Sequence, residues 1–201
     1  MEVETIEGFR ARFNDGSGAV RVVSLLSPTC LVCQYGAGVV KTIIGSAGED
    51  DLRGLIAWIP MMDSDDLRAA RREAGEMQHD RIGHVWDGDR RLGTAFAGTL
   101  GLEGHAWDVY LLYGAGAVWT AESPPEPDFW MHQLPTSVRA DPARLLRPGR
   151  FAQEARSLLG KGSEPLDADI PLILHAVGLS AIRTDRKQPS LEEVAAVSMS
   201  K

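Results

Sequence analysis

The two cysteines are the residues of this chain best suited to chemistry, and they lie three positions apart as Cys30 and Cys33. A thiol pair at this spacing can exchange a disulfide with a partner or bind a thiophilic metal ion. A structural zinc ion needs four ligands, and the chain has no second pair of cysteines to complete such a site. Redox or thiol chemistry is therefore the leading interpretation. A metal or metalloid site and inert packing of two small side chains are the alternatives.

The sequence around the cysteines predicts a strand, a turn and a helix, in that order. Apolar residues dominate 22–26, a Ser-Pro-Thr turn at 27–29 ends them, and apolar residues recur at helical spacing between 39 and 44. The thiols are then expected at the N-terminus of that helix, where unpaired N–H groups and the helix dipole favour an anion. We therefore predict that the pKa of Cys30 lies below that of a free thiol.

Strands and helices alternate along the first 121 residues, which is the pattern of an α/β fold. The predicted strands cover residues 52–59, 82–86 and 107–113, a tight turn at 114–116 leads into a fifth strand at 117–119, and the predicted helices cover 5–13, 67–77 and 92–100. We predict that residues 1–122 form one domain around this core.

A proline-rich linker at 123–127 opens the rest of the chain. We predict that residues 123–201 form a C-terminal helical extension that packs on the same core. Its aromatic segment, 128–134, is expected to cap a sheet face or a core edge, and the alternative is a lid that brings Trp130 and His132 near the thiols. Helical patterns follow at 142–147 and 150–160, then an apolar run expected to be buried at 170–177 and a final helix at 191–197.

Composition argues against two classes of partner. The 201 residues are 44% hydrophobic and 24% charged, which is ordinary for a folded soluble protein. A net charge of −7 with no basic stripe weighs against nucleic acid. No stretch reaches the roughly 18 apolar residues of a membrane span, and the acidic N-terminus lacks the features of a leader. We therefore expect a protein that is cytoplasmic or was cut from its leader, with no membrane and no nucleic-acid partner.

The order of strand, turn, Cys-x-x-Cys and helix resembles the active-site region of the thioredoxin superfamily, and the resemblance covers about residues 5–121. It implies a thioredoxin-like fold with a central mixed β-sheet flanked by helices. It also implies a thiol–disulfide oxidoreductase in which Cys30 is the nucleophile and Cys33 the resolving thiol. Such an enzyme needs no organic cofactor, and its partners would be a protein or small-molecule disulfide and an electron-donating reductase.

The sequence departs from the superfamily at two positions that matter for this chemistry. Ala106 stands where the superfamily has a cis-proline facing the thiols, and we expect a trans peptide bond there because a cis bond before alanine costs about 3 kcal/mol. Ser24 stands where the superfamily has a buried acid, six residues before the first cysteine.

Three side chains could replace that acid as the proton handler, namely Asp108, His105 and Asp87. His105 is also the candidate third ligand in the alternative interpretation, a soft-ion binder that clamps a thiophilic metal or metalloid with the two thiols. Besides the cysteines we expect six supporting residues at the site: Pro28, Thr29, His105, Ala106, Trp107 and Asp108.

Overall fold

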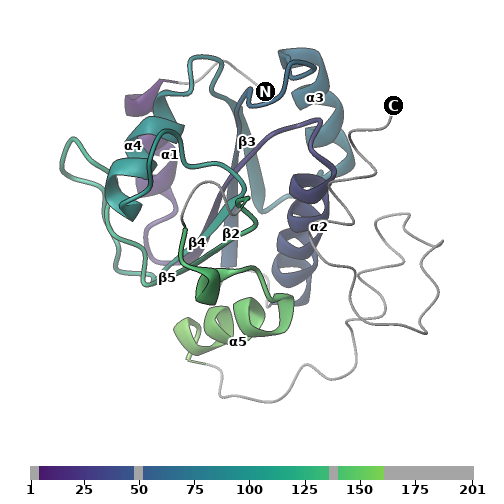
Figure 1. Cartoon of the computed structure of the whole chain (residues 1–201). Coiled ribbons are helices and arrows are strands. Elements are labelled where there is room, and N and C mark those ends of the chain that lie inside the picture. Colours follow the sequence, from purple (N-terminus) through teal and green to yellow (C-terminus); the bar gives the residue numbers. More distant parts are fainter. Residues whose placement is uncertain (1–4, 48–51, 136–139, 161–201) are drawn as a thin grey trace, which may run out of the picture.

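A five-stranded mixed sheet forms the centre of the protein, in the order β3-β2-β1-β4-β5 (Figure 1). The computed structural model describes residues 5–47, 52–135 and 140–160. The strands are β1 (Val20–Leu26), β2 (Leu52–Trp58), β3 (Ile82–Trp86), β4 (Val109–Tyr113) and β5 (Phe129–His132). The first three strands run parallel, and β4 and β5 are each antiparallel to the preceding neighbour in the sheet. The predicted mixed α/β sheet is confirmed.

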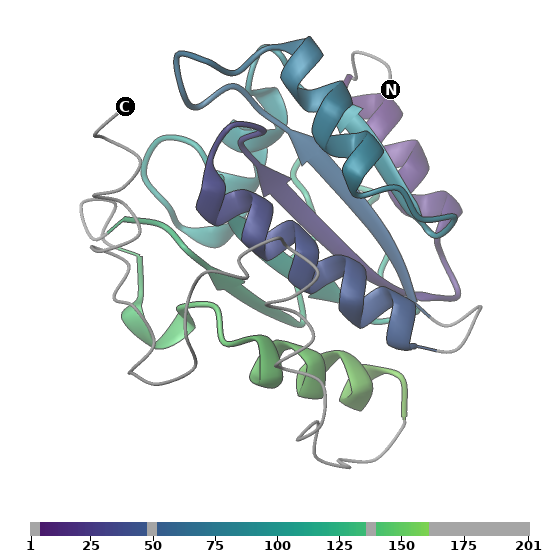
Figure 2. The same cartoon turned by 90° about the vertical axis from the view of Figure 1, so that its right-hand side faces the viewer.

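Helices cover both faces of the sheet (Figures 1 and 2). They are α1 (Ile6–Asp15), α2 (Leu31–Ser46), α3 (Leu67–Glu76), α4 (Arg91–Leu100) and α5 (Pro148–Leu158), with a short 3-10 turn at Pro142–Arg144. Buried residues of α2, α3 and α5 form one apolar cluster with the sheet, and those of α1 and α4 form another on the opposite face. The helices predicted from periodicity lie within a few residues of the observed ones.

β1 is the middle strand, and all seven of its residues are buried. Val22 and Leu26 belong to the cluster under α2, whereas Val23 and Leu25 belong to the cluster under α1 and α4. A strand covered on both faces reads as a nearly continuous apolar run, here interrupted by Ser24, which is why the sequence located it. Its carboxyl end leads directly into the turn that carries the first cysteine.

The predicted position of the fifth strand, 117–119, is wrong. The fifth strand is β5, which follows the proline-rich linker and pairs with β4 from Val109 opposite His132 to Leu112 opposite Phe129. The aromatic segment is thus part of the sheet as its edge strand, and it neither caps a sheet face nor forms a lid. Its pairing extends the sheet beyond residue 122, and the domain division there stays a prediction.

Residues 117–119 are occupied by other contacts. Trp119 is almost fully buried, and its ring meets those of Phe9, Phe13 and Phe96 at centroid distances of 6.3, 6.2 and 5.7 Å. Its backbone N–H donates to Asn14 Oδ1 at 2.9 Å, and Asn14 Nδ2 donates back to the Trp119 carbonyl at 3.0 Å. These contacts tie the segment to α1, so its backbone groups are not free to form a strand.

The part of the extension that the structure describes contains the two predicted helical segments. Asp141 caps the 3-10 turn, because its carboxylate accepts from the N–H of Ala143 at 2.9 Å. α5 follows with Pro148 in its first turn, and Phe151 on this helix is fully buried against the sheet. The predicted apolar run at 170–177 and the helix at 191–197 lie outside the described residues.

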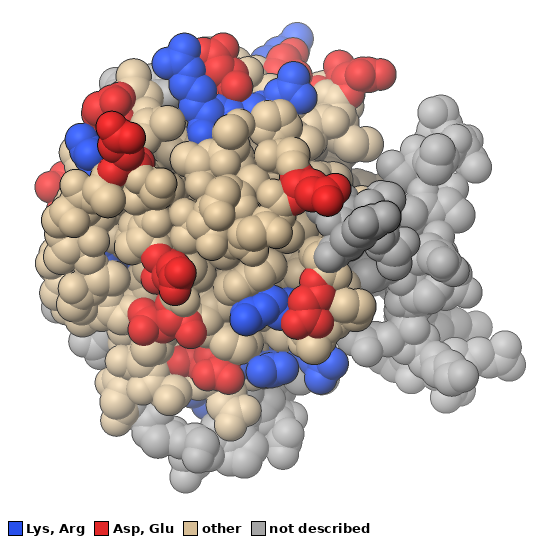
Figure 3. Space-filling view, turned by 60° about the vertical axis from the view of Figure 1, so that its left-hand side comes forward, with Lys and Arg blue, Asp and Glu red and all other residues tan. Residues whose placement is uncertain are grey.

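The surface gives two further observations. Among the described residues, no helix combines the length and apolar character needed to cross a membrane. On the face shown in Figure 3, acidic and basic side chains are interspersed, with an uncharged area between them.

Candidate active site

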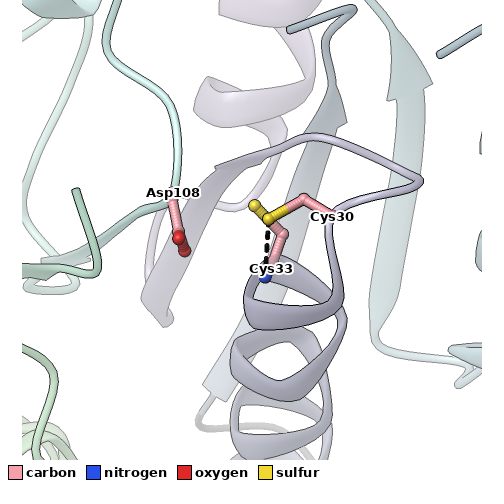
Figure 4. A group of neighbouring side chains, drawn as sticks. All are labelled: Cys30, Cys33 and Asp108. Carbon is pink, nitrogen blue, oxygen red and sulfur yellow. Dashed lines mark hydrogen bonds between the residues drawn. The ribbon is translucent and has the colours of Figure 1, made fainter. Parts of the chain in front are cut away.

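Cys30 is the N-cap of α2 and is partly exposed, whereas Cys33 lies in the first turn and is fully buried (Figure 4). The backbone N–H of Cys33 points at the Cys30 sulfur at 3.5 Å. A hydrogen bond with the Cys33 thiol, aided by the N–H groups of Cys33 and Val32, lowers the pKa of Cys30 to about 7 against the opposing effect of burial. Burial raises the pKa of Cys33 well above its usual value. The two thiols are therefore chemically unequal.

Alkylation of Cys30 by iodoacetamide is expected to reach half its maximal rate near pH 7, because only the thiolate reacts and the pKa of Cys30 is about 7. A free thiol would show the midpoint at about 8.5. The rates can be followed against pH by peptide mass spectrometry, with the same protein in denaturant as control. A midpoint at or above the denatured value would contradict the placement of Cys30 at the helix N-terminus.

Asp65 fixes the turn that precedes Cys30. Its carboxylate accepts from the Ser27 hydroxyl at 2.7 Å and from the N–H and hydroxyl of Thr29 at 3.0 and 2.7 Å. It also accepts from the N–H groups of Met61 and Met62, both at 2.8 Å, in the loop after β2. One side chain thus joins the two loops at this end of the sheet. The cap of α3 is the neighbouring residue, Asp66, whose Oδ1 accepts from the N–H of Ala69 at 2.7 Å.

Pro28 and Thr29, which the sequence placed at the site, hold the same turn from the other side. Pro28 is buried, and its carbonyl accepts from Gln34 Nε2 at 2.9 Å. This bond links the turn to the first turn of α2. Pro28 has no ionisable group, and the Thr29 hydroxyl is bonded to Asp65, so both residues position Cys30.

The loop that faces the thiols adopts a trans peptide bond before Ala106, as expected. The N–H of Ala106 donates to the carbonyl of Gly93 in α4 at 2.8 Å. Proline has no N–H, so proline at this position would lose that bond. His105 shares a hydrogen bond with Thr94 Oγ1 through its Nδ1 at 3.0 Å. Trp107 is partly buried and packs against both apolar clusters.

Asp108 is the acid beside the dithiol. It is 1% exposed, stands immediately before β4 with a left-handed φ of 51°, and has a carboxylate oxygen within 4.8 Å of both sulfur atoms (Figure 4). Burial raises the pKa of Asp108 to about 7, and the negative charge of Cys30 adds to this while hydrogen bonds from Tyr110 and Cys33 oppose it. Of the three candidate proton handlers, Asp108 is the one that the structure brings to the thiols.

The other two candidates, His105 and Asp87, form hydrogen bonds with α4. His105 is held by Thr94 of that helix, as described above. The Asp87 carboxylate accepts from the N–H groups of Arg91 and Leu92 at 2.9 and 2.8 Å, and it thereby caps the first turn. The left-handed Arg90 at the helix start offers no cap of its own. Asp87 is therefore a structural acid.

Tyr110 and Gln133 complete the site and were not foreseen from the sequence. The Tyr110 hydroxyl lies 2.7 Å from Asp108 Oδ1 and 2.8 Å from Gln133 Oε1. A phenol has one proton, so it can donate to only one of two acceptors at a time. A proton on Asp108 would satisfy the second contact, which accords with the raised pKa of that acid. Tyr110 follows Asp108 by two residues, a spacing that places both on one face of a strand. That spacing was a signal in the sequence.

Gly36 in α2 makes room for this hydroxyl. A Cβ at that position would lie 1.7 Å from Tyr110 Oη and 2.7 Å from Gln133 Oε1. Any larger residue would therefore push the Tyr110 ring away from Asp108. The space that Gly36 leaves in α2 is therefore filled by side chains of the protein itself.

Comparison with solved structures identifies the fold. A thioredoxin-like protein determined in its oxidized form superposes with a TM-score of 0.51 at 14% identity, over 80% of this chain and 86% of that protein. A secreted disulfide oxidoreductase of Mycobacterium tuberculosis, homologous to E. coli DsbE, gives 0.46 at 11% identity over 71% and 84%. No family model and no curated protein matches the sequence. The fold of this chain is thioredoxin-like, and it carries the Cys-x-x-Cys pair at the position that the resemblance implied.

Proposed function

We propose that the protein is a thiol–disulfide oxidoreductase. The observation that carries this proposal is the inequality of the two thiols. Cys30 is partly exposed at a helix N-terminus with a pKa of about 7, so a large fraction of it is thiolate at neutral pH. Cys33 is buried and protonated beside the Asp108 carboxylate. The first arrangement suits attack on an incoming disulfide, and the second suits a later step inside the protein.

The reaction would proceed in two exchanges. In the first, the Cys30 thiolate attacks a substrate disulfide, forms a new S–S bond with one substrate sulfur and releases the other as a thiolate, which takes a proton from water. In the second, the thiol of Cys33 passes its proton to Asp108 and its sulfur attacks Cys30. The remaining substrate sulfur leaves as a thiolate, so the substrate gains two electrons and Cys30 and Cys33 form a disulfide.

Asp108 acts in the second exchange as a general base. Its carboxylate oxygen lies within 4.8 Å of both sulfur atoms, and a pKa of about 7 lets it both accept and release a proton near neutral pH. The superfamily resemblance placed an acid on β1, where this chain has Ser24. Ser24 is paired with Tyr110 of β4 in the sheet register, and the residue immediately before β4, Asp108, supplies the acid instead.

The proposed partners follow from this chemistry. The substrate is a protein or small-molecule disulfide that reaches the exposed side of Cys30, and a dithiol reductase returns the oxidised pair to the reduced form. A reducing compartment such as the cytoplasm, where a pair of this kind is more often catalytic than structural, is the proposed location.

The direct test is reduction of an insulin-type disulfide by dithiothreitol with catalytic amounts of the protein. We expect acceleration by the native protein and none by Cys30→Ser. A His105→Ala variant is the matched control, because this side chain is turned to Thr94, and it should retain the native rate. A native protein that gives no acceleration, and whose cysteines do not form a disulfide in glutathione buffers, would overturn the proposal.

A further inference from the structure

Three atoms that can ligate a thiophilic metal ion converge at the dithiol. They are Cys30 Sγ, Cys33 Sγ and a carboxylate oxygen of Asp108, and all lie within 4.8 Å of one another (Figure 4). Ligands that surround a zinc-sized ion tetrahedrally at 2.0–2.3 Å are about 3.3–3.8 Å apart. Modest side-chain rotations would therefore close the three atoms around one ion.

The charges of the three groups favour a cation at this point. All three become anionic when they lose their protons, and the salt bridges of the described residues involve none of them. A carboxylate and two thiolates this close repel one another, whereas a divalent cation between them would turn that repulsion into attraction. Two sulfur donors and one oxygen donor suit a soft or borderline ion such as Cd²⁺ or Zn²⁺.

Access and the open coordination position also fit such a site. Cys33 and Asp108 are buried, while Cys30 is partly exposed and leaves a route from solvent. Sites with three protein ligands keep a fourth position for water or another small ligand. In the alternative interpretation of the sequence, the candidate third ligand was His105, but its ring is bonded to Thr94. The structure offers Asp108 in its place.

We propose that the reduced protein binds one thiophilic divalent cation through Cys30, Cys33 and Asp108, and that the bound ion blocks disulfide exchange. Each thiol that enters the coordination sphere releases its proton, and no electrons are transferred. The same sulfur atoms cannot bind the ion while they are joined as a disulfide. The blocking part of the proposal rests on the proposed function, whereas the binding part does not.

The binding part can be tested by titrating the reduced protein with Cd²⁺ and following the ultraviolet thiolate-to-cadmium charge-transfer band. We expect one ion per protein, with release of protons measurable by a pH indicator. The disulfide form should show no band, and either Cys→Ser variant should lose most of it. Asp108→Asn should bind at least about ten-fold more weakly, while His105→Ala should bind as the native protein does. Equal affinity of Asp108→Asn and native protein would overturn the three-ligand site.

X-ray absorption spectroscopy of the zinc-loaded native protein identifies the ligands of the ion without the use of a variant. We expect two sulfur ligands at about 2.3 Å and at least one oxygen at about 2.0–2.2 Å. Coordination by sulfur from two protein molecules, or no stoichiometric binding at all, would sink the proposal. The rate of disulfide exchange by the metal-free protein, measured with a chelator present, tests the proposed function separately. If the native protein catalyses exchange in chelator and Cd²⁺ leaves that rate unchanged, only the blocking role of the ion is refuted.

Discussion

Cys33→Ser is expected to accumulate a covalent mixed disulfide with its substrate, and Cys30→Ser is expected to form none. In the first variant the exposed Cys30 thiolate can still attack, but the buried sulfur that would release the product is gone. In the second variant the remaining thiol is fully buried, and burial holds its pKa well above the usual value. Turnover should fall to background in both, because each exchange needs its own sulfur.

The measurement is mass spectrometry of the two variants after incubation with oxidised cell extract, under conditions that preserve disulfides. Adducts should appear on Cys33→Ser and disappear on addition of dithiothreitol. The double variant, which lacks both thiols, is the control for non-covalent carry-over. Equal trapping by the two single variants, or trapping by neither, would refute the division of labour. A function in metal binding alone predicts no such asymmetry, since both sulfurs would be ligands of one ion.

The strand, turn and helix around the cysteines could be predicted because their signals are local. β1 is buried on both faces and reads as an apolar run, and α2 shows its periodicity within a few turns. Placing Cys30 at the N-terminus of α2 needed no information from elsewhere in the chain. The thioredoxin-like fold followed from the same segment and from the alternation of elements after it.

β5 could not be located in this way. It has only four residues and no clear period, and the glycines at 114 and 116 gave a stronger hairpin signal earlier in the chain. Residues 117–119 are instead held by the pair of hydrogen bonds between Trp119 and Asn14, which are 105 residues apart. Contacts at such separation leave no local pattern.

Contacts between distant parts of the chain also explain why the residues beside the thiols could not all be predicted. Asp108 and His105 lie three residues apart in one loop, and the local sequence does not determine which of the two side chains faces the thiols. The choice is made by the left-handed backbone of Asp108 and by the bond between His105 and Thr94. Gln133 was beyond prediction because it follows β5, whose backbone pairing places it against Tyr110.

Asp108→Asn is expected to slow the second exchange by about 10²–10⁴-fold, the usual contribution of a positioned general base. Asparagine tolerates the left-handed φ of this position and keeps a hydrogen-bonding partner for Tyr110, so the fold should survive. Attack by Cys30 should change little. Stopped-flow mixing with a disulfide peptide should therefore show a normal first phase and a long-lived mixed disulfide. A second phase as fast as in the native protein would contradict the role of Asp108.

The pH dependence separates this catalytic role from a structural one. In the native protein the second exchange should accelerate as Asp108 ionises, with a midpoint near its pKa of about 7. In the variant the proton of Cys33 must leave without that base. The pKa of Cys33 lies well above the usual thiol value, so the rate of the second exchange should keep rising far into the alkaline range.

The stability of the native protein should instead fall with rising pH. The folded-state pKa of Asp108 is raised, so the unfolded chain loses this proton first and native stability falls as pH rises from about 4 to about 7. Asparagine carries no charge at any of these pH values. Denaturant midpoints of variant and native protein should therefore diverge over this window in favour of the variant, while its second exchange becomes slower than the native one. A residue that served only to hold the fold would lose stability and activity together.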